Sequence, residues 1–129
     1  MGRKSEKKND KRLSLAQAHR RVGRMKDALS LFRKVLDDEP ENIEALVSLT
    51  EISLELGQAT GAASLILRAL TCNPEHSQCL NVLDQVLKAL KETGSQAQLL
   101  FEYSQILKEN SLWQKALIKH RQALRLNPA

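Results

Sequence analysis

Apolar residues recur along most of the chain at intervals of three and four positions, which is the pattern of amphipathic helices. The pattern predicts seven helices, over residues 10–22, 25–38, 43–56, 59–72, 77–92, 95–109 and 112–127. Glycine and proline are few, and aromatic residues make up only 3% of the chain, which disfavours a β-sandwich or barrel. We therefore expect an all-α protein in which short connections make successive helices antiparallel. Ser77, Ser95 and Ser111 are the expected N-caps of the last three helices.

A repeat of 34 positions organises the first half of the chain. Five pairs of residues are separated by this interval: Gly23 and Gly57, Ala28 and Ala62, Phe32 and Ile66, Val35 and Ala69, and Pro40 and Pro74. Each residue type suits a defined place in a helical hairpin. Glycine permits the tight turn between the two helices, alanine allows their axes to approach, and proline ends the second helix.

This spacing resembles the tetratricopeptide repeat, with two full repeats over residues 9–42 and 43–76. The positions that are aromatic in that family are mostly occupied here by aliphatic residues and by His19. The resemblance implies an α-solenoid of antiparallel helix pairs wound into a right-handed superhelix. It also implies that the first helix of each pair lines a concave surface.

The third repeat loses this phase. Its first helix is predicted from Ser77, but the next glycine comes late, at Gly94. Counting back from Pro128 places a final repeat at 97–128, with Ala116, His120 and Ala123 in the motif positions. The helix over 95–109 is therefore expected where the second helix of repeat three would lie, although its sequence is typical of a first helix.

The net charge of +5 is concentrated at the beginning of the chain, because residues 1–12 carry a net charge of +4. We expect residues 1–9 to form a basic, disordered tail and residues 10–129 to form one repeat domain, a fragment of a longer protein. No apolar stretch is long enough to span a membrane. Two cysteines cannot form a disulfide framework, so a cytoplasmic location is expected, with a nuclear one as the alternative given the basic tail.

The resemblance implies a partner-binding groove on the first helices of the repeats. The residues predicted to line it are Leu13, Gln17, Arg20, Arg21, Glu44, Val47, Ser48, Glu51, Glu55, Asn81, Gln85 and Lys88, together with Ser14, Gln78 and Val82. The groove would be basic at one end, acidic in the middle and rich in amides beyond. A subfamily that binds chaperone tails holds a terminal carboxylate with lysine, arginine and asparagine, and none of these residue types stands at the five matching positions here, so this clamp is not expected.

No arrangement of residues suggests catalysis or a bound cofactor. There is no glycine-rich phosphate loop, and no nucleophile has a recognisable base and orienting partner. Cys72, His76 and Cys79 are spaced C-x3-H-x2-C, but three ligands are too few for a closed zinc site. Trp113, the single tryptophan, is expected to seal the open end of the array or to pack on the helix over 95–109.

The sequence therefore predicts a protein–protein interaction scaffold that binds a peptide segment or partner protein in its concave groove. One alternative is a nucleic-acid-associated module that uses the basic tail and the basic last helix, although stacking aromatic residues are lacking. Another is the non-catalytic N-terminal arm of a larger enzyme. Self-association through the exposed last helix is a further candidate interaction.

Overall fold

The computed structural model describes the backbone of residues 2–127 and their side chains, except those of residues 2–6 and 92. Within these residues the chain forms seven α-helices and one short 3-10 helix, with no strand, so the predicted all-α class is confirmed. The elements are α1 (Gly2–Arg21), α2 (Met25–Asp38), α3 (Ile43–Glu55), α4 (Ala59–Cys72), α5 (Ser77–Ala89), η1 (Lys91–Thr93), α6 (Gln96–Glu109) and α7 (Trp113–Leu126).

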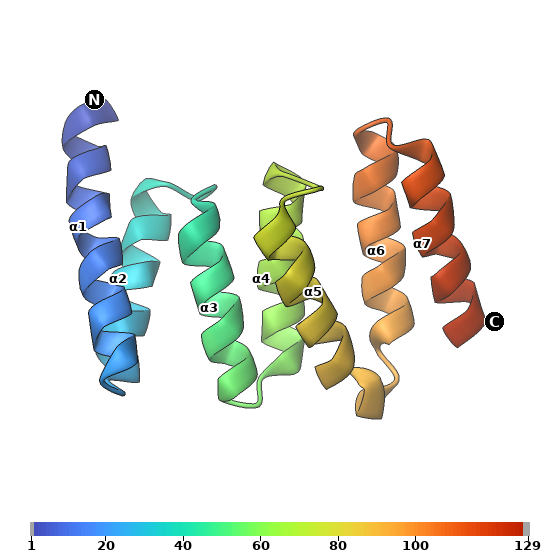
Figure 1. Cartoon of the computed structure of the whole chain (residues 1–129), viewed down its shortest axis with the longest axis horizontal. Coiled ribbons are helices and arrows are strands. Elements are labelled where there is room, and N and C mark those ends of the chain that lie inside the picture. Colours follow the sequence, from blue (N-terminus) through green and yellow to red (C-terminus); the bar gives the residue numbers. More distant parts are fainter. Residues whose placement is uncertain (1, 128–129) are drawn as a thin grey trace.

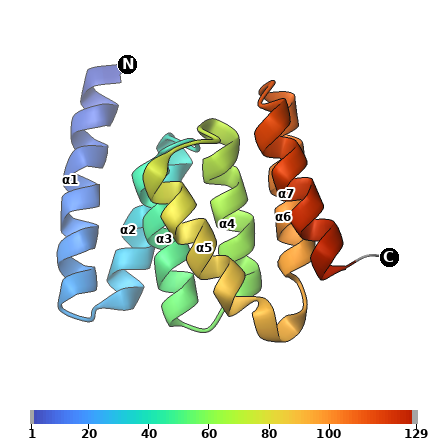
Figure 2. The ribbon, with the colours of Figure 1, turned by 45° about the vertical axis from the view of Figure 1, so that its right-hand side comes forward.

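The helices are arranged as hairpins stacked side by side (Figure 1). In this view α1, α3 and α5 form a front row, while α2 and α4 lie behind them. Each of α1 and α3 packs most extensively on the helix that follows it, and α2 and α4 also contact the first helix of the next hairpin. Figure 2, turned from this view, shows α6 and α7 next to each other at the C-terminal end of the array.

The two motif alanines lie where the helices of a hairpin cross. Ala28 and Ala62 are fully buried, as are Phe32 and Ile66 one turn further along α2 and α4. A small side chain at the crossing lets the two axes approach, and the larger residue fills the space beside it. The register of the first two repeats is therefore the one predicted from the sequence.

Residues in the left-handed backbone region make the turns inside the hairpins. Gly23 and Gly57 have φ angles of 85° and 75°, which glycine adopts without steric cost. In the last hairpin the corresponding residue is Ser111, with a φ angle of 62°. Ser111 was predicted to be an N-cap and instead ends the turn after α6, so α7 begins after Leu112.

The helix caps differ from the prediction in two more places. His76 precedes α5, and its Nδ1 accepts the backbone N–H of Cys79 at 3.4 Å, so Ser77 is the first helical residue rather than the cap. Ser95 does precede α6 but makes no capping hydrogen bond. Asn42, which was not among the predicted caps, caps α3 by accepting the N–H of Ala45 at 2.9 Å.

The first helix is longer than predicted. It begins at Gly2 rather than near residue 10, so residues 2–9, predicted to be a disordered tail, continue α1. Lysine, arginine and glutamate are good helix formers, and a high local charge does not by itself end a helix. Asn9 is buried, and the guanidinium of Arg12 donates to Asn9 at 3.1 Å and to Asp38 at 2.8 Å.

Helix α6 has both positions that the sequence suggested for it, as the second helix of repeat three and as the first helix of the last repeat. It packs on α4, as the second helix of repeat three would, but its most extensive contact is with α7 and not with α5. Tyr103 and Leu107 of α6 are buried in the main core, and the Tyr103 hydroxyl donates to the carbonyl of Pro74 at 2.7 Å. Lys115 of α7 pairs with Glu75 on the same turn. Pro128, which ends the last repeat by sequence, lies outside the described residues.

Candidate interaction surfaces

The face formed by α1, α3 and α5 carries the predicted groove residues, but not all of them reach the surface. Leu13, Val47 and Ser48 are buried between helices, with only 6%, 1% and 3% of their surfaces exposed. Val82 is buried in the same way. These four side chains support the packing of neighbouring repeats, and their place in the predicted groove is corrected accordingly.

Polar side chains on this face link α1 to α3. The Gln17 side-chain amide donates to the hydroxyl of Ser48 at 2.8 Å. The guanidinium of Arg20 reaches two carboxylates, Glu51 at 3.2 Å and Glu55 at 3.0 Å. Burial by itself would lower the pKa of Arg20, but its hydrogen bonds to Glu55 and Glu51 outweigh this and raise the pKa. Arg20, from the predicted basic end, therefore neutralises part of the acidic row predicted for the middle of the groove.

The side chains on α5 are more open. Asn81, Gln85 and Lys88 are exposed and, being four and three positions apart, share one side of the helix. Among the described side chains none forms a hydrogen bond or ion pair with these three. Glu44, at the start of α3, and Arg21, at the end of α1, are also exposed. The predicted groove thus has two parts. On α1 and α3 its polar side chains are bonded to each other, and on α5 they form an exposed row.

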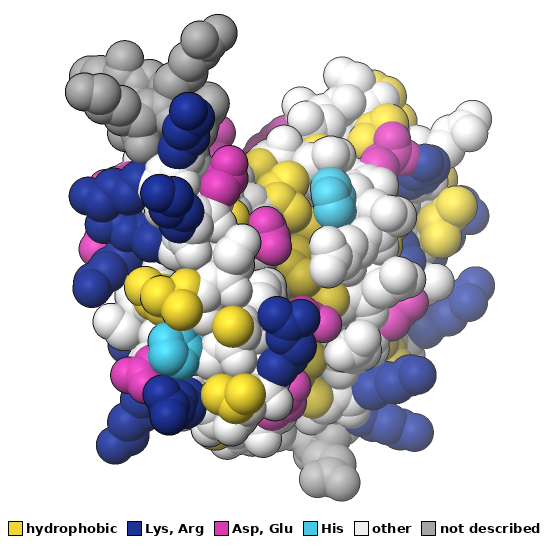
Figure 3. Space-filling model, turned by 60° about the vertical axis from the view of Figure 1, so that its left-hand side comes forward, with side chains coloured by type: hydrophobic (Ala, Val, Ile, Leu, Met, Phe, Trp, Pro, Cys, Tyr) yellow, Lys and Arg dark blue, Asp and Glu magenta, His cyan; other side chains and the backbone are white. Residues whose placement is uncertain are grey.

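Figure 3 shows the molecule obliquely from the α1 side. Basic side chains crowd the left edge of the view, where α1 and α2 lie, and hydrophobic and acidic side chains mix near the middle. The exposed basic residues of α1 and α2 include Lys7, Lys8, Lys11, Lys26, Arg33 and Lys34.

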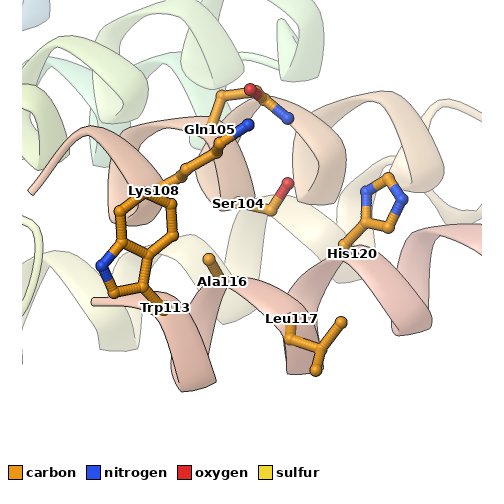
Figure 4. Close-up of a pocket in the computed structure, with 7 residues that line it drawn as sticks. All are labelled: Ser104, Gln105, Lys108, Trp113, Ala116, Leu117 and His120. Carbon is orange, nitrogen blue, oxygen red and sulfur yellow. The ribbon is translucent and has the colours of Figure 1, made fainter. Parts of the chain in front are cut away.

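A second surface lies between the last two helices (Figure 4). Trp113 and Leu117 of α7 and Gln105 and Lys108 of α6 stand on the two sides of a hollow of about 250 Å³. Ser104, Ala116 and His120 complete its lining. A second hollow, of about 410 Å³, shares His120 and extends along the same helices past Phe101 and Leu124. We call these two adjoining hollows the end groove.

The end groove was not predicted as a site. Trp113 was expected to seal the end of the array or to pack on α6, whereas 59% of its surface is exposed. Phe101 and His120 both line the second hollow, and the centroids of their rings are 5.7 Å apart. The sequence did contain one indication of this groove. The repeat register aligns Trp113 with Met25 and Ala59 of the earlier hairpins.

Cys72, His76 and Cys79 are each buried or hydrogen-bonded within the fold. Cys79 is buried, and this burial raises the pKa of its thiol. The Nδ1 of His76 accepts the backbone N–H of Cys79, and the Cys72 thiol donates to the carbonyl of Arg68 at 3.3 Å. The described residues contain no cluster of three or more metal-ligating side chains. Among them, no helix has the length and apolar character that crossing a membrane requires.

Hairpins stacked in this way define a helical repeat protein. A sequence model of the tetratricopeptide repeat matches residues 19–86, from within α1 to within α5, which is more than half of the chain. The chain therefore belongs to the tetratricopeptide repeat family, whose repeats generally mediate protein–protein interaction. A comparison with curated proteins found no match.

Proposed function

We propose that this protein is a non-catalytic scaffold that binds an extended segment of a partner protein along the face of α3 and α5. The observation that carries the proposal is the exposed row of Asn81, Gln85 and Lys88 on α5, beside an α1–α3 pair held together by the Arg20 ion pairs. A cytoplasmic or nuclear adaptor role is part of the same proposal and rests on the sequence alone.

The chemistry of the row favours a peptide backbone as the ligand. An amide side chain offers both a donor and an acceptor, as a peptide group does, so Asn81 and Gln85 can each bind one peptide unit of an extended segment. Lys88 would attract an acidic side chain of the partner, and Glu44 a basic one. Because α1 and α3 are already fixed to each other, binding on this face costs little ordering of the scaffold.

The residues at the clamp positions support an internal segment of the partner over a free C-terminus. The five positions that hold a terminal carboxylate in the chaperone-binding subfamily are Leu13, Gln17, Ser48, Gln78 and Val82. None is cationic, and Leu13, Ser48 and Val82 are buried. The clamp positions therefore lack the positive charge that would hold a terminal carboxylate.

Selection from a displayed library of random linear peptides against the full chain tests the proposal. We expect peptides whose affinity falls about tenfold or more when Asn81 and Gln85 are both replaced by alanine, since each loses its hydrogen bonds to the peptide. Gln114→Ala is the matched control, because Gln114 is an exposed amide on α7, away from this face. Selected peptides that bind the double variant as tightly as the wild type would contradict the proposal.

The nucleic-acid alternative is separated by a second measurement on the same chain. Phosphate binding by the exposed lysines of α1 should weaken steeply with salt, because it depends on counterion release. We expect a single-stranded oligonucleotide to bind only at low salt, and replacing Lys7, Lys8 and Lys11 by glutamine to remove that binding. Oligonucleotide binding that persists at high salt would favour the nucleic-acid function instead.

A further inference from the structure

The end groove occupies the position that is covered inside the array. In the repeat register, Trp113, Leu117 and Leu124 of α7 correspond to Met25, Leu29 and Leu36 of α2. The three residues of α2 are buried or partly buried, with α3 packed against that helix. Their counterparts on α7 are 59%, 48% and 48% exposed. The same repeat positions thus form a helix-binding face in the first hairpin and, among the described residues, an open face in the last.

The shape of the end groove suits a helix. Its floor is made of small residues, with Ser104 and Ala116 in one hollow and Ala97 and Ala123 in the other. Larger side chains form the walls, with Phe101 on α6 and Trp113, Leu117 and Leu124 on α7. A small-residue floor between apolar ridges lets an incoming helix approach closely, as ridge-into-groove packing requires.

The polar residues beside the groove indicate which helix would fit. Gln105 and Lys108 line it at the repeat positions of Gln17 and Arg20. In the first hairpin Gln17 binds the hydroxyl of Ser48, and Arg20 binds the carboxylates of Glu51 and Glu55. A helix docked in the end groove would meet Gln105 and Lys108 with the same pattern, a hydroxyl followed by carboxylates three and seven positions later.

The charge around the groove points the same way. Helix α7 contains no acidic residue and carries Lys115, Lys119, Arg121 and Arg125, of which Lys115 pairs with Glu75. The acidic residues of α6, Glu102 and Glu109, do not line the groove. The opposite edge of the molecule, at α1 and α2, is also rich in exposed lysine and arginine. Two copies joined through α7, or through α7 and the opposite edge, would bring like charges together, which disfavours a second copy as the occupant.

We propose that the end groove binds an acidic amphipathic helix of a partner protein, patterned like α3. Its apolar side would cover Trp113, Leu117 and Leu124, and its carboxylates would face Lys108. This is helix-in-groove recognition, and it is separate from the extended-peptide site on α3 and α5.

The test uses the full chain and a capped peptide that copies residues 42–56, which include Ser48, Glu51 and Glu55. Trp113 is the only tryptophan and the peptide has none, so its emission reports occupation of the groove directly. We expect the peptide to shift that emission to shorter wavelength. Leu117→Asp should weaken binding about tenfold or more, because it places a charge on the apolar wall. Ile118→Asp is the matched control, since Ile118 is similarly exposed at 54% but does not line the groove.

A charge exchange tests the polar register independently. Lys108→Glu should weaken binding of the native peptide, and a peptide with lysine in place of Glu51 and Glu55 should restore it. Three results would overturn the proposal: no shift of Trp113 emission, an equal loss with Ile118→Asp, or a shift that depends on chain concentration without peptide. The last would identify a second copy as the occupant.

Discussion

The hairpins α1–α2 and α6–α7 share the motif positions of the repeat, but these positions have different surroundings. Ala28, Phe32 and Val35 of α2 are completely buried, whereas at the matching positions of α7 His120 is only half-buried between Ala116 and Ala123. The difference follows from the neighbours, because α2 has another hairpin packed against it and the described residues place none on the outer side of α7. A repeat hairpin therefore acquires much of its buried surface, and hence its stability, from the next repeat.

The largest expected effect of this difference is at the central position of the second helix. Phe32→Ala should lower the free energy of unfolding by about 3–5 kcal/mol, because it removes a fully buried aromatic ring and leaves a cavity. His120→Ala, at the matching position, should cost less than about 1 kcal/mol. Urea denaturation of the two variants measures both, and equal losses would contradict the comparison.

Overpacking at the helix crossing should show the same contrast on a smaller scale. Ala62→Leu should cost about 1–3 kcal/mol, since Ala62 is completely buried and a larger side chain would overpack the helix crossing. Ala116→Leu should cost less, because Ala116 lines the open end groove. The added side chain would also narrow the groove, so this variant should bind the peptide of residues 42–56 more weakly. Thermal unfolding and peptide titration check the two statements, and a near-zero loss for Ala62→Leu would mean that the repeat register is wrong.

Substitutions at the left-handed turn residues should change the free energy of unfolding in opposite directions in the second and the last hairpin. Gly57→Ala should destabilise by about 1 kcal/mol, because the φ angle of 75° is unfavourable for a residue with a Cβ. Ser111→Gly should stabilise by about 0.5–1 kcal/mol, since it relieves the same strain in the last hairpin. Chemical denaturation of each single variant provides the measurement. A stabilising Gly57→Ala would contradict the assigned turn geometry.

The smallest expected effect concerns the ion pairs between α1 and α3. Arg20→Gln should cost less than about 1 kcal/mol, and less still at high salt, because Arg20 and its partners are partly exposed. The raised pKa of Arg20 means that its contribution is present throughout the neutral range and is lost only when the pH rises above the already high ordinary value. Arg21→Gln, which removes an exposed charge with no partner among the described side chains, is the control. An equal, salt-independent loss for both variants would show that the ion pairs do not stabilise the fold.

Much of the fold could be predicted from the sequence because the motif residues act locally. Gly23, Ala28 and Pro40 mark a turn, a crossing and a helix end within one hairpin, and their recurrence gave the register of the second. The start of α1 was missed because charge was taken as a sign of disorder, although the residues involved are good helix formers.

The candidate sites were harder to predict, since they depend on contacts between hairpins. The pairing of Arg20 with Glu51 and Glu55 joins residues 31 and 35 positions apart, three positions below and one above the repeat interval, and it appears only when the helices are stacked. Val47 and Ser48 were assigned to the groove by resemblance. Both are buried, because α3 packs against α2, α4 and α5 and so has little free surface. The end groove was not predicted because the sequence left two positions open for α6, and the structure shows that it packs mainly on α7.

Amide hydrogen exchange, resolved by region under native conditions, tests the central comparison most directly. The free energy of opening measured at each amide reports how strongly the local structure is held. We predict that amides of α3 and α4 exchange only through global unfolding, whereas amides of α7 exchange through local opening at clearly lower free energy. Equal protection of α4 and α7 would contradict the account, because it would show that the last hairpin is held as firmly as those with neighbours on both sides.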